Sequence, residues 1–246
     1  MFGLAPTGKL TQFEEIFAHL YEHYGSRGWW PLFSEDSQAP KYIPGNYGKK
    51  SENEQLEIIV GSILTQNTSW KNAETALVNL NTQKLLRIEE LSKISEEELA
   101  DVIRPSRFSK QKAKTIKGIV KFLENESLEA LEQLSIPELR KKLLALYGIG
   151  NETADSIILY AFNGLSFVID AYTKRIFSRV GLIEESISYT NLQNEITKNI
   201  PQNGALYNEY HALIVALAQD HCTKKPTCSL CPIKNLCTTG SCVPHF

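Results

Sequence analysis

The sequence predicts an all-α protein, because apolar residues follow helical spacing along almost the whole chain and strand patterns are nearly absent. Six segments repeat apolar residues every three or four positions: 11–24, 56–64, 69–80, 95–103, 110–125 and 207–219. The proline- and glycine-rich stretch 31–50 interrupts them and is expected to be a loop or a domain crossing. With 246 residues, the chain can bury a core as one compact unit or as two small domains.

The clearest local pattern is a pair of helices joined by a short glycine turn. Ser135 and Glu138 form a capping box with proline early in the first turn, so one helix begins there. Gly148 and Gly150 bracket the turn, and Asn151 is expected to cap a second helix that continues to residue 162. Such a hairpin exposes backbone N–H groups, which suits a nucleic-acid phosphate.

A short apolar run, 167–169, follows this hairpin and is expected to be buried. Asp170 comes next at a natural N-cap position, and Gly181 ends the helix that it opens. A capping role alone would explain Asp170, and a simple helix turn would explain the glycines. The short spacing between the glycine turn and Asp170 instead favours a carboxylate presented near a bound nucleic-acid backbone.

Four of the five cysteines lie within sixteen residues at the spacing C-x5-C-x2-C-x5-C, and Cys242 follows them. A disulfide framework is not expected, because the rest of a long chain has no cysteine and no secretion signal is visible. The pattern indicates a metal site, with zinc as the generic candidate, although zinc sites usually show two C-x2-C pairs. The four candidate ligands are Cys222, Cys228, Cys231 and Cys237.

The charge distribution bears on the partner. A net charge of −2 by itself argues against nucleic acid, but the segment 104–121 carries seven basic residues and no acidic one. Acidic residues concentrate in 89–101 and 124–132, which are expected to be solvated helix faces. No apolar run approaches the length of a membrane span, so we expect a cytoplasmic protein with no membrane partner.

The segment 146–175 resembles the helix-hairpin-helix and Gly/Pro-Asp (HhH-GPD) module of the endonuclease III superfamily of DNA glycosylases. The family hairpin usually reads Leu-Pro-Gly-Val-Gly, whereas here Tyr147 replaces the proline and Ile149 the valine. The resemblance implies that Asp170 is the catalytic aspartate. It places Glu152 where bifunctional members carry a lysine nucleophile. It also implies DNA contacts from the hairpin, at Gly148, Ile149, Gly150 and Thr153.

The cysteine loop 222–237 is similar to the [4Fe–4S] loop of the same superfamily, whose first gap is usually one residue longer. Cys242 would then be a spare thiol or a substitute ligand. The implied fold is a six-helix barrel, residues 48–165, that ends in the hairpin. Residues 1–47, the N-terminal helix and a crossing loop, would join 166–246 in a helical iron–sulfur domain made from both termini.

Two further side chains acquire DNA-binding roles through the resemblance. In this superfamily a glutamine at the position of Gln66 enters the duplex and fills the gap left by an everted nucleotide. Phe108 matches the loop that wedges into the opposite strand. Lys174, one turn beyond Asp170, is interpreted as a phosphate contact or a surface lysine. Helix capping near Gln66 and a half-buried aromatic at a helix start are the structural alternatives.

The string Trp29-Trp30-Pro31 resembles the 3-methyladenine branch of the superfamily, in which an aromatic pair lines the pocket for the alkylated base. Core packing is the default interpretation of two tryptophans, but adjacent ones cannot easily enter one core. The pocket is therefore assigned to Trp29, Trp30, Tyr172 and Glu152. One departure is Leu56, where that branch commonly has an aromatic residue.

Together these features predict a monofunctional base-excision glycosylase that flips alkylated purines such as 3-methyladenine out of damaged double-stranded DNA. A [4Fe–4S] cluster and a monovalent cation at the hairpin are the implied cofactors. We expect a monomer in the cytoplasm of a prokaryote, associated with the nucleoid. Two alternatives remain open: an oxidised-pyrimidine glycosylase with AP-lyase activity, and a non-catalytic DNA-binding protein with a four-cysteine module.

Overall fold

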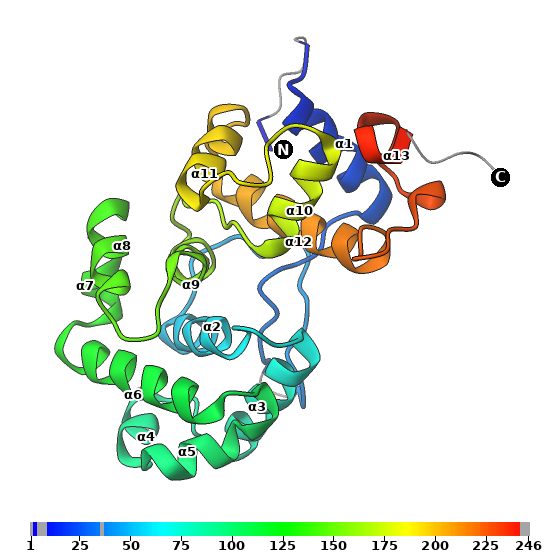
Figure 1. Ribbon diagram of the computed structural model, residues 1–246. Coiled ribbons are helices and arrows are strands. Elements are labelled where there is room, and N and C mark those ends of the chain that lie inside the picture. The colour runs from blue at the N-terminus through cyan, green and yellow to red at the C-terminus, as the bar shows by residue number, and fades with distance from the viewer. Residues whose placement is uncertain (1, 4–8, 35–36, 242–246) are drawn as a thin grey trace. The chain divides into compact units, whose positions relative to one another are not determined.

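A computed structural model describes residues 2–3, 9–34 and 37–241 and confirms the all-α class (Figure 1). An isolated antiparallel bridge joins Leu32 to Lys41. None of the helices in these ranges is both long enough and apolar enough to cross a membrane. The chain divides into two compact units, and unit 1 is made from both ends of the chain.

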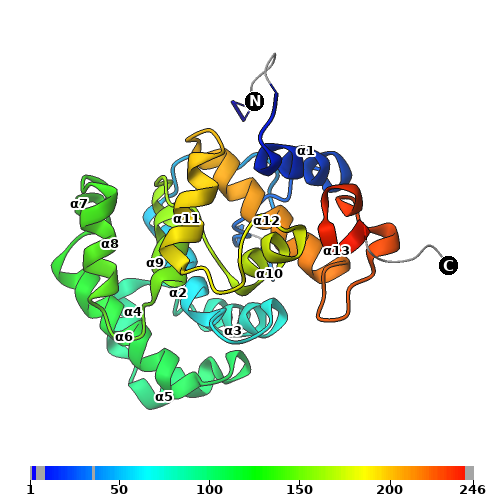
Figure 2. The same cartoon turned by 45° about the horizontal axis from the view of Figure 1, so that its top comes forward.

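Unit 1 comprises Met1–Trp29, Pro44–Tyr47 and Phe167–Phe246. Its centre is α12, a 17-residue helix buried along most of its length that packs against α1 and α10 (Figure 2). Phe17, Phe177 and Tyr210 are fully buried there, and the Tyr210 hydroxyl donates to the Phe13 carbonyl. The helices of the unit are α1 (Gln12–Tyr24), α10 (Ala171–Val180), α11 (Tyr189–Lys198), α12 (Gly204–Asp220) and α13 (Thr238–Ser241), with 3-10 turns η3 (Cys228–Leu230) and η4 (Lys234–Leu236).

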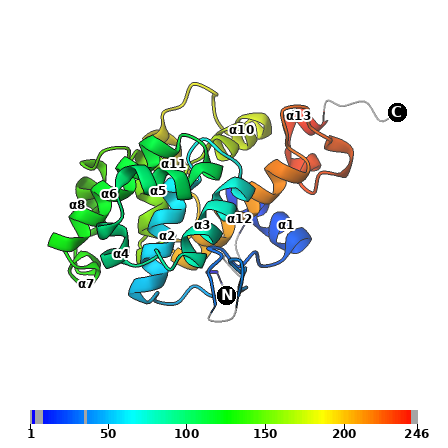
Figure 3. The same ribbon diagram turned by 90° about the horizontal axis from the view of Figure 1, so that it is seen from below.

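Unit 2 comprises Trp30–Ile43 and Gly48–Ser166. Its central helix is α2, which buries ten of its thirteen residues and packs against α3, α6 and α9. Figure 3 shows α2 beside α3. The elements are α2 (Glu52–Leu64), α3 (Trp70–Thr82), α4 (Ile88–Lys93), α5 (Glu96–Val102), the 3-10 turn η1 (Arg104–Ser106), α6 (Ser109–Asn125), α7 (Leu128–Glu132), α8 (Ile136–Leu144), α9 (Asn151–Ser156) and the π-helical segment η2 (Ile157–Ala161).

Local capping chemistry sets the helix ends of the site. The capping box of Ser135 and Glu138 is present, and Asp170 caps α10. Gly181 ends that helix in the left-handed conformation. The expected cap of the second hairpin helix was wrong by one residue: Gly150 is the N-cap, because the Asn151 side chain instead accepts a hydrogen bond from Arg140.

The expected division placed all of residues 1–47 with the C-terminal part, whereas Trp30–Ile43 belongs to unit 2. Trp30 is buried against Trp70 and Tyr160, and a methyl group on Gly61 would lie 2.9 Å from its ring. The Phe33 amide also donates to Glu57 of α2. These contacts attach the crossing segment to the core around α2.

Candidate active site

The hairpin between α8 and α9 depends on a glycine. Gly148 has φ +78°, and a Cβ there would lie 2.1 Å from the Thr115 hydroxyl, so a larger residue meets both strain and a clash. The Ile149 amide donates to the Leu146 carbonyl. The amides of Gly148 and Gly150, in contrast, donate to no backbone carbonyl within the described chain. These two N–H groups are therefore available to an anion.

An ion pair spans the hairpin and fixes its two helices. Arg140 of α8 makes two hydrogen bonds to Asp155 of α9, at 2.7 and 3.1 Å. Asp155 is fully buried and also accepts from Ser166 at 2.7 Å. A buried carboxylate needs such partners to remain in the core. The pair therefore holds the helices that present the turn.

The outer face of the hairpin combines an aromatic ring with positive charge. Tyr147 is 57% exposed, and the Lys114 ammonium lies 4.5 Å from the centre of its ring. Ile149, by contrast, is buried and anchors the turn. The residue that replaces the family proline therefore adds a cation–π pair beside the free amides.

Gln66 lies against the hairpin. Its side-chain amide donates to the Gly148 carbonyl at 3.0 Å and to the Thr153 hydroxyl at 2.9 Å. A polar cavity of about 120 Å³ lies beside it and is lined by Ser62, Glu152 and Thr153, among others. The Glu152 side chain is exposed in the first turn of α9.

Phe108 lies at the start of α6 with its ring 57% exposed. Arg107 and Phe108 both have positive φ, 63° and 47°, which is unusual for two consecutive residues other than glycine. Backbone strain of this kind is common at ligand-binding sites. The ring is thus more exposed than the half-buried aromatic considered as its structural alternative.

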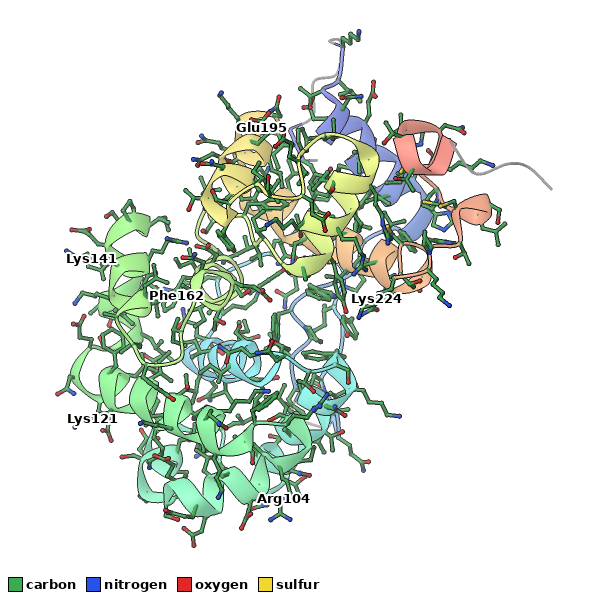
Figure 4. The ribbon with its side chains drawn as sticks, in the orientation of Figure 1. Arg104, Lys121, Lys141, Phe162, Glu195 and Lys224 are labelled. Atoms are coloured by element: carbon green, nitrogen blue, oxygen red, sulfur yellow. The ribbon has the colours of Figure 1, made fainter. Side chains whose placement is uncertain are left out.

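The basic run on and before α6 is not one uniform surface. Arg104, Arg107, Lys110, Lys114 and Lys121 are exposed, and Figure 4 shows Arg104 and Lys121 pointing away from the ribbon. Lys112 is buried, and Lys117 is half-buried with its ammonium on three backbone carbonyls. The surface charge is therefore smaller than the sequence count indicated.

In unit 1, Asp170 has its carboxylate held in place by α10 and α12. The amide and hydroxyl of Thr173 both donate to its Oδ1 at 2.7 Å, and His211 Nε2 lies 3.7 Å from its Oδ2. Burial by itself would raise the pKa of Asp170. The interactions with His211 and Thr173 outweigh that effect and lower the pKa below its usual value. The carboxylate is therefore ionised at neutral pH.

His211 was missed at the level of sequence. It is buried on α12, and its ring meets the Trp29 ring edge to face at 5.6 Å, so one imidazole contacts both the tryptophan and the aspartate. A sequence signal did exist, since Asn208, Glu209 and His211 are polar residues in an otherwise apolar helix.

Glu209, on the same helix, holds the turn that leads to Trp29. It is fully buried and accepts hydrogen bonds from the Arg27 amide, the Ser26 hydroxyl and the Tyr47 hydroxyl. Burial and the hydrogen bond to Glu209 raise the pKa of Tyr47, which keeps that phenol a donor. Helix α12 therefore positions both the aspartate and the segment that carries the first tryptophan.

The remaining predicted site residues lie in different surroundings. Trp29 is half-buried in unit 1, whereas Trp30 is buried in unit 2. Tyr172 is half-buried, with the Arg175 guanidinium 5.0 Å from its ring centre, and Lys174 is half-buried on α10.

All four cysteines of the 222–237 loop line one cavity in unit 1. Burial raises the pKa of the Cys231 thiol to about 11, and the charges of the other three thiols add to this rise. Four thiols that line one cavity are a donor set of the kind that binds a metal centre. Within the described residues, no three His, Cys, Asp or Glu side chains are placed to hold a single metal ion. Cys242 lies outside the described residues.

Arginines of α10 reach this loop. Arg179 Nη1 lies 3.2 Å from the Cys222 sulfur and donates to the Thr223 carbonyl at 2.6 Å. Arg175 donates to the Cys222 carbonyl at 2.9 Å. The helix that begins at Asp170 therefore contacts the cysteine loop near its other end.

Comparison with known proteins resolves the family. The pattern of the HhH-GPD superfamily of base excision DNA repair proteins matches residues 60–202. The chain belongs to this superfamily of DNA repair glycosylases. It is 39% identical over 234 residues to a Methanocaldococcus jannaschii protein provisionally assigned as a DNA repair glycosylase, covering 93% of this chain and 97% of that one.

Solved structures of glycosylases share the fold of this HhH-GPD protein. The H. pylori 3-methyladenine DNA glycosylase bound to 1,N6-ethenoadenine has a TM-score of 0.66 and 25% identity, and the match covers 85% of this chain and 98% of that one. A trapped endonuclease III–DNA covalent intermediate has a TM-score of 0.73 and 18% identity, over 95% and 98% of the two chains. The two-domain all-α architecture is therefore that of endonuclease III.

Proposed function

We propose that this HhH-GPD protein is a monofunctional DNA glycosylase that hydrolyses the N-glycosidic bond of alkylated purines such as 3-methyladenine. The observation that carries the proposal is the Asp170 carboxylate, held ionised by Thr173 and His211, with the Trp29 ring in edge-to-face contact with the same imidazole. A fixed anion and an aromatic ring that share one imidazole neighbour suit a reaction in which both the base and the sugar carry positive charge.

The chemistry follows from where charge develops. As the glycosidic bond lengthens, the sugar acquires oxocarbenium character, and a fixed carboxylate stabilises that charge. Asp170 would also orient a water molecule for attack on the anomeric carbon. Its lowered pKa keeps it in the required form without a further proton transfer.

The substrate class rests on the aromatic groups. A purine methylated on a ring nitrogen is cationic, and an indole face favours it by roughly 1–2 kcal/mol once the base is desolvated. Trp29, which is half-buried, is proposed as the residue that stacks on the base. Tyr172, Glu152 and Trp30 are proposed as further pocket residues, and Trp30 would act from its buried position in unit 2. The charge also makes the base a good leaving group, so little acid catalysis is needed.

The DNA grip is assigned to unit 2. The N–H groups of Gly148 and Gly150 would bind a phosphate, aided by Thr153 and by a monovalent cation on nearby carbonyls. Gln66 would leave the hairpin to fill the gap of the flipped nucleotide, and the exposed Phe108 would wedge the opposite strand. Lys174, on α10 of unit 1, is proposed as a further phosphate contact.

We assign the four-cysteine loop to a [4Fe–4S] cluster held by Cys222, Cys228, Cys231 and Cys237. The four thiols line one cavity, and a [4Fe–4S] cluster would take its four thiolate ligands from them. The group would contribute structure and would set the loop that α10 contacts. It takes no part in bond cleavage in this proposal.

The absence of strand cleavage is part of the proposal, because position 152 carries a carboxylate and cannot form a Schiff base. The rival activity, a glycosylase with AP-lyase chemistry, would need another amine. Lys174 on α10, one turn after Asp170, is the candidate for it.

The test is release of free base from methylated duplex DNA by the wild type and by Asp170→Asn, with strand breaks scored before and after alkali. Asparagine still caps a helix, so the variant should fold. Release of methyladenine that is lost in the variant, with breaks only after alkali, supports the proposal. Absence of base release, or breaks without alkali that Lys174→Ala abolishes, refutes it in favour of the rival.

A further inference from the structure

Lys112 is an almost completely buried lysine on α6, with 2% of its surface exposed. Its ammonium donates to two backbone carbonyls, that of Leu64 at 2.8 Å and that of Ser106 at 2.6 Å. Burial, together with the nearby charge of Arg107, lowers the pKa of Lys112 to about 8. Lysine is almost never fully buried unless its ammonium is paired, as it is here with the two carbonyls.

The two acceptors end two separate helical elements, each directly before a loop. Leu64 is the last residue of α2 and comes two positions before Gln66. Ser106 ends the turn η1 and comes two positions before Phe108. One ammonium thus joins the backbones from which both proposed DNA-inserting side chains project.

The second loop needs an external restraint. Arg107 and Phe108 both adopt positive φ, which the chain keeps only where the surroundings hold it. Ser106 is fully buried, and its hydroxyl donates to the Ile103 carbonyl within the same turn. The backbone carbonyl of Ser106 is therefore the group through which another element can fix the loop. Lys112 provides that contact and relates the loop to the end of α2.

We propose that Lys112 is a positioning residue that sets the spacing between Gln66 and Phe108, so that both enter the duplex together. The inference rests on the inserting roles assigned to these two residues under the proposed function. Lys112 itself does not touch DNA.

A purely structural lysine is available on the same helix for comparison. The Lys117 ammonium donates to the carbonyls of Leu91, Ser92 and Ile94 at 2.7 to 2.8 Å, near the end of α4. No residue with a proposed DNA contact follows those carbonyls. Lys117→Met therefore removes a comparable set of hydrogen bonds and serves as the matched control.

The experiment measures binding to a duplex with a single abasic-site analogue and to the same duplex undamaged. Fluorescence of 2-aminopurine beside the analogue reports unstacking. Lys112→Met should reduce the preference for the damaged duplex at least tenfold and lower the fluorescence change. Lys117→Met should lower the unfolding midpoint but leave that preference unchanged. Lys112→Arg keeps hydrogen-bond donors at this position, so it should retain part of the wild-type preference for the damaged duplex. If Lys112→Met does not fold, Lys112→Arg is measured in its place.

The decisive comparison repeats Lys112→Met in a chain that already carries Gln66→Ala and Phe108→Ala. If Lys112 acts through the two side chains, it causes no further loss of damaged-duplex preference there, although it still lowers the unfolding midpoint. A loss equal to that in the wild type, or equal effects of Lys112→Met and Lys117→Met, overturns the inference alone. Wild-type preference in the Gln66→Ala, Phe108→Ala chain overturns the inserting roles as well.

Discussion

Replacing Gly148 by alanine is the sharpest test of the hairpin geometry. The backbone there has φ +78°, and left-handed conformations cost a residue other than glycine about 1–2 kcal/mol. The added Cβ would also lie 2.1 Å from the Thr115 hydroxyl, which is buried and bonded to the Gln111 carbonyl. Forcing extra volume into such a site typically costs a further 1–3 kcal/mol, roughly.

We therefore expect Gly148→Ala to lower the free energy of unfolding by about 2–5 kcal/mol, measured by urea denaturation. Thr115→Ala separates the two causes, because it removes the hydroxyl and the methyl group and leaves only a Cβ at 3.2 Å. The double variant should recover the packing part, about 1–3 kcal/mol, and keep the conformational part.

Gly150→Ala is the matched control, since its φ is −97° and no atom lies within 4 Å of the Cβ position. The loss of a good helix cap should cost only about 1 kcal/mol there. If Gly148→Ala proves no more costly than Gly150→Ala, or if Thr115→Ala restores nothing, the description of this turn is wrong.

Three further predictions concern buried charges. Burial raises the pKa of Glu57 to about 7 against the opposing hydrogen bond from a backbone amide, so the folded state holds a proton more tightly than the unfolded one. That stabilisation is complete below about pH 4.5 and is lost as pH rises through 7, a change of about 3 kcal/mol. Urea titrations should therefore show Glu57→Gln more stable than the wild type at pH 8, with the gap closing at pH 5; parallel pH curves would contradict this. Asp155→Ala leaves the Arg140 guanidinium without its buried partner and should cost about 3 kcal/mol in the same measurement, while a loss below 1 kcal/mol would show that the pair does not hold the hairpin. His211→Ala should move the acidic limb of the pH profile for base release upward, because His211 helps to lower the pKa of Asp170; an unmoved limb would remove His211 from the site.

The structural features that could be predicted from the sequence are those that depend on residues close together in the chain. The cap at Asp170, the capping box at Ser135 and the end at Gly181 were all predicted, because each depends on residues within one turn. The cap at Gly150 was misplaced by one residue, because a side chain from α8 competes for Asn151.

Features that depend on distant partners could not be predicted. Lys112 belonged to a basic run, and only the fold shows that its ammonium faces two carbonyls from other elements. The polar residues around His211 marked its helix as unusual, but nothing in the sequence paired His211 with Asp170. The adjacent tryptophans entered different units because Gly61 leaves room for the Trp30 ring.

The construction of unit 1 from both ends of the chain has a consequence for synthesis. Tyr210 of α12 bonds to Phe13 of α1 across 197 positions, so α1 is made long before its partner. At translation rates of 5–20 residues per second, the interval is roughly 10 to 40 seconds. The apolar stripe of α1, which includes Phe17 and Leu20, is exposed to the cell during that time. Unit 2 is complete by residue 166 and can fold on the ribosome, whereas unit 1 cannot complete its core until its late helices have been made.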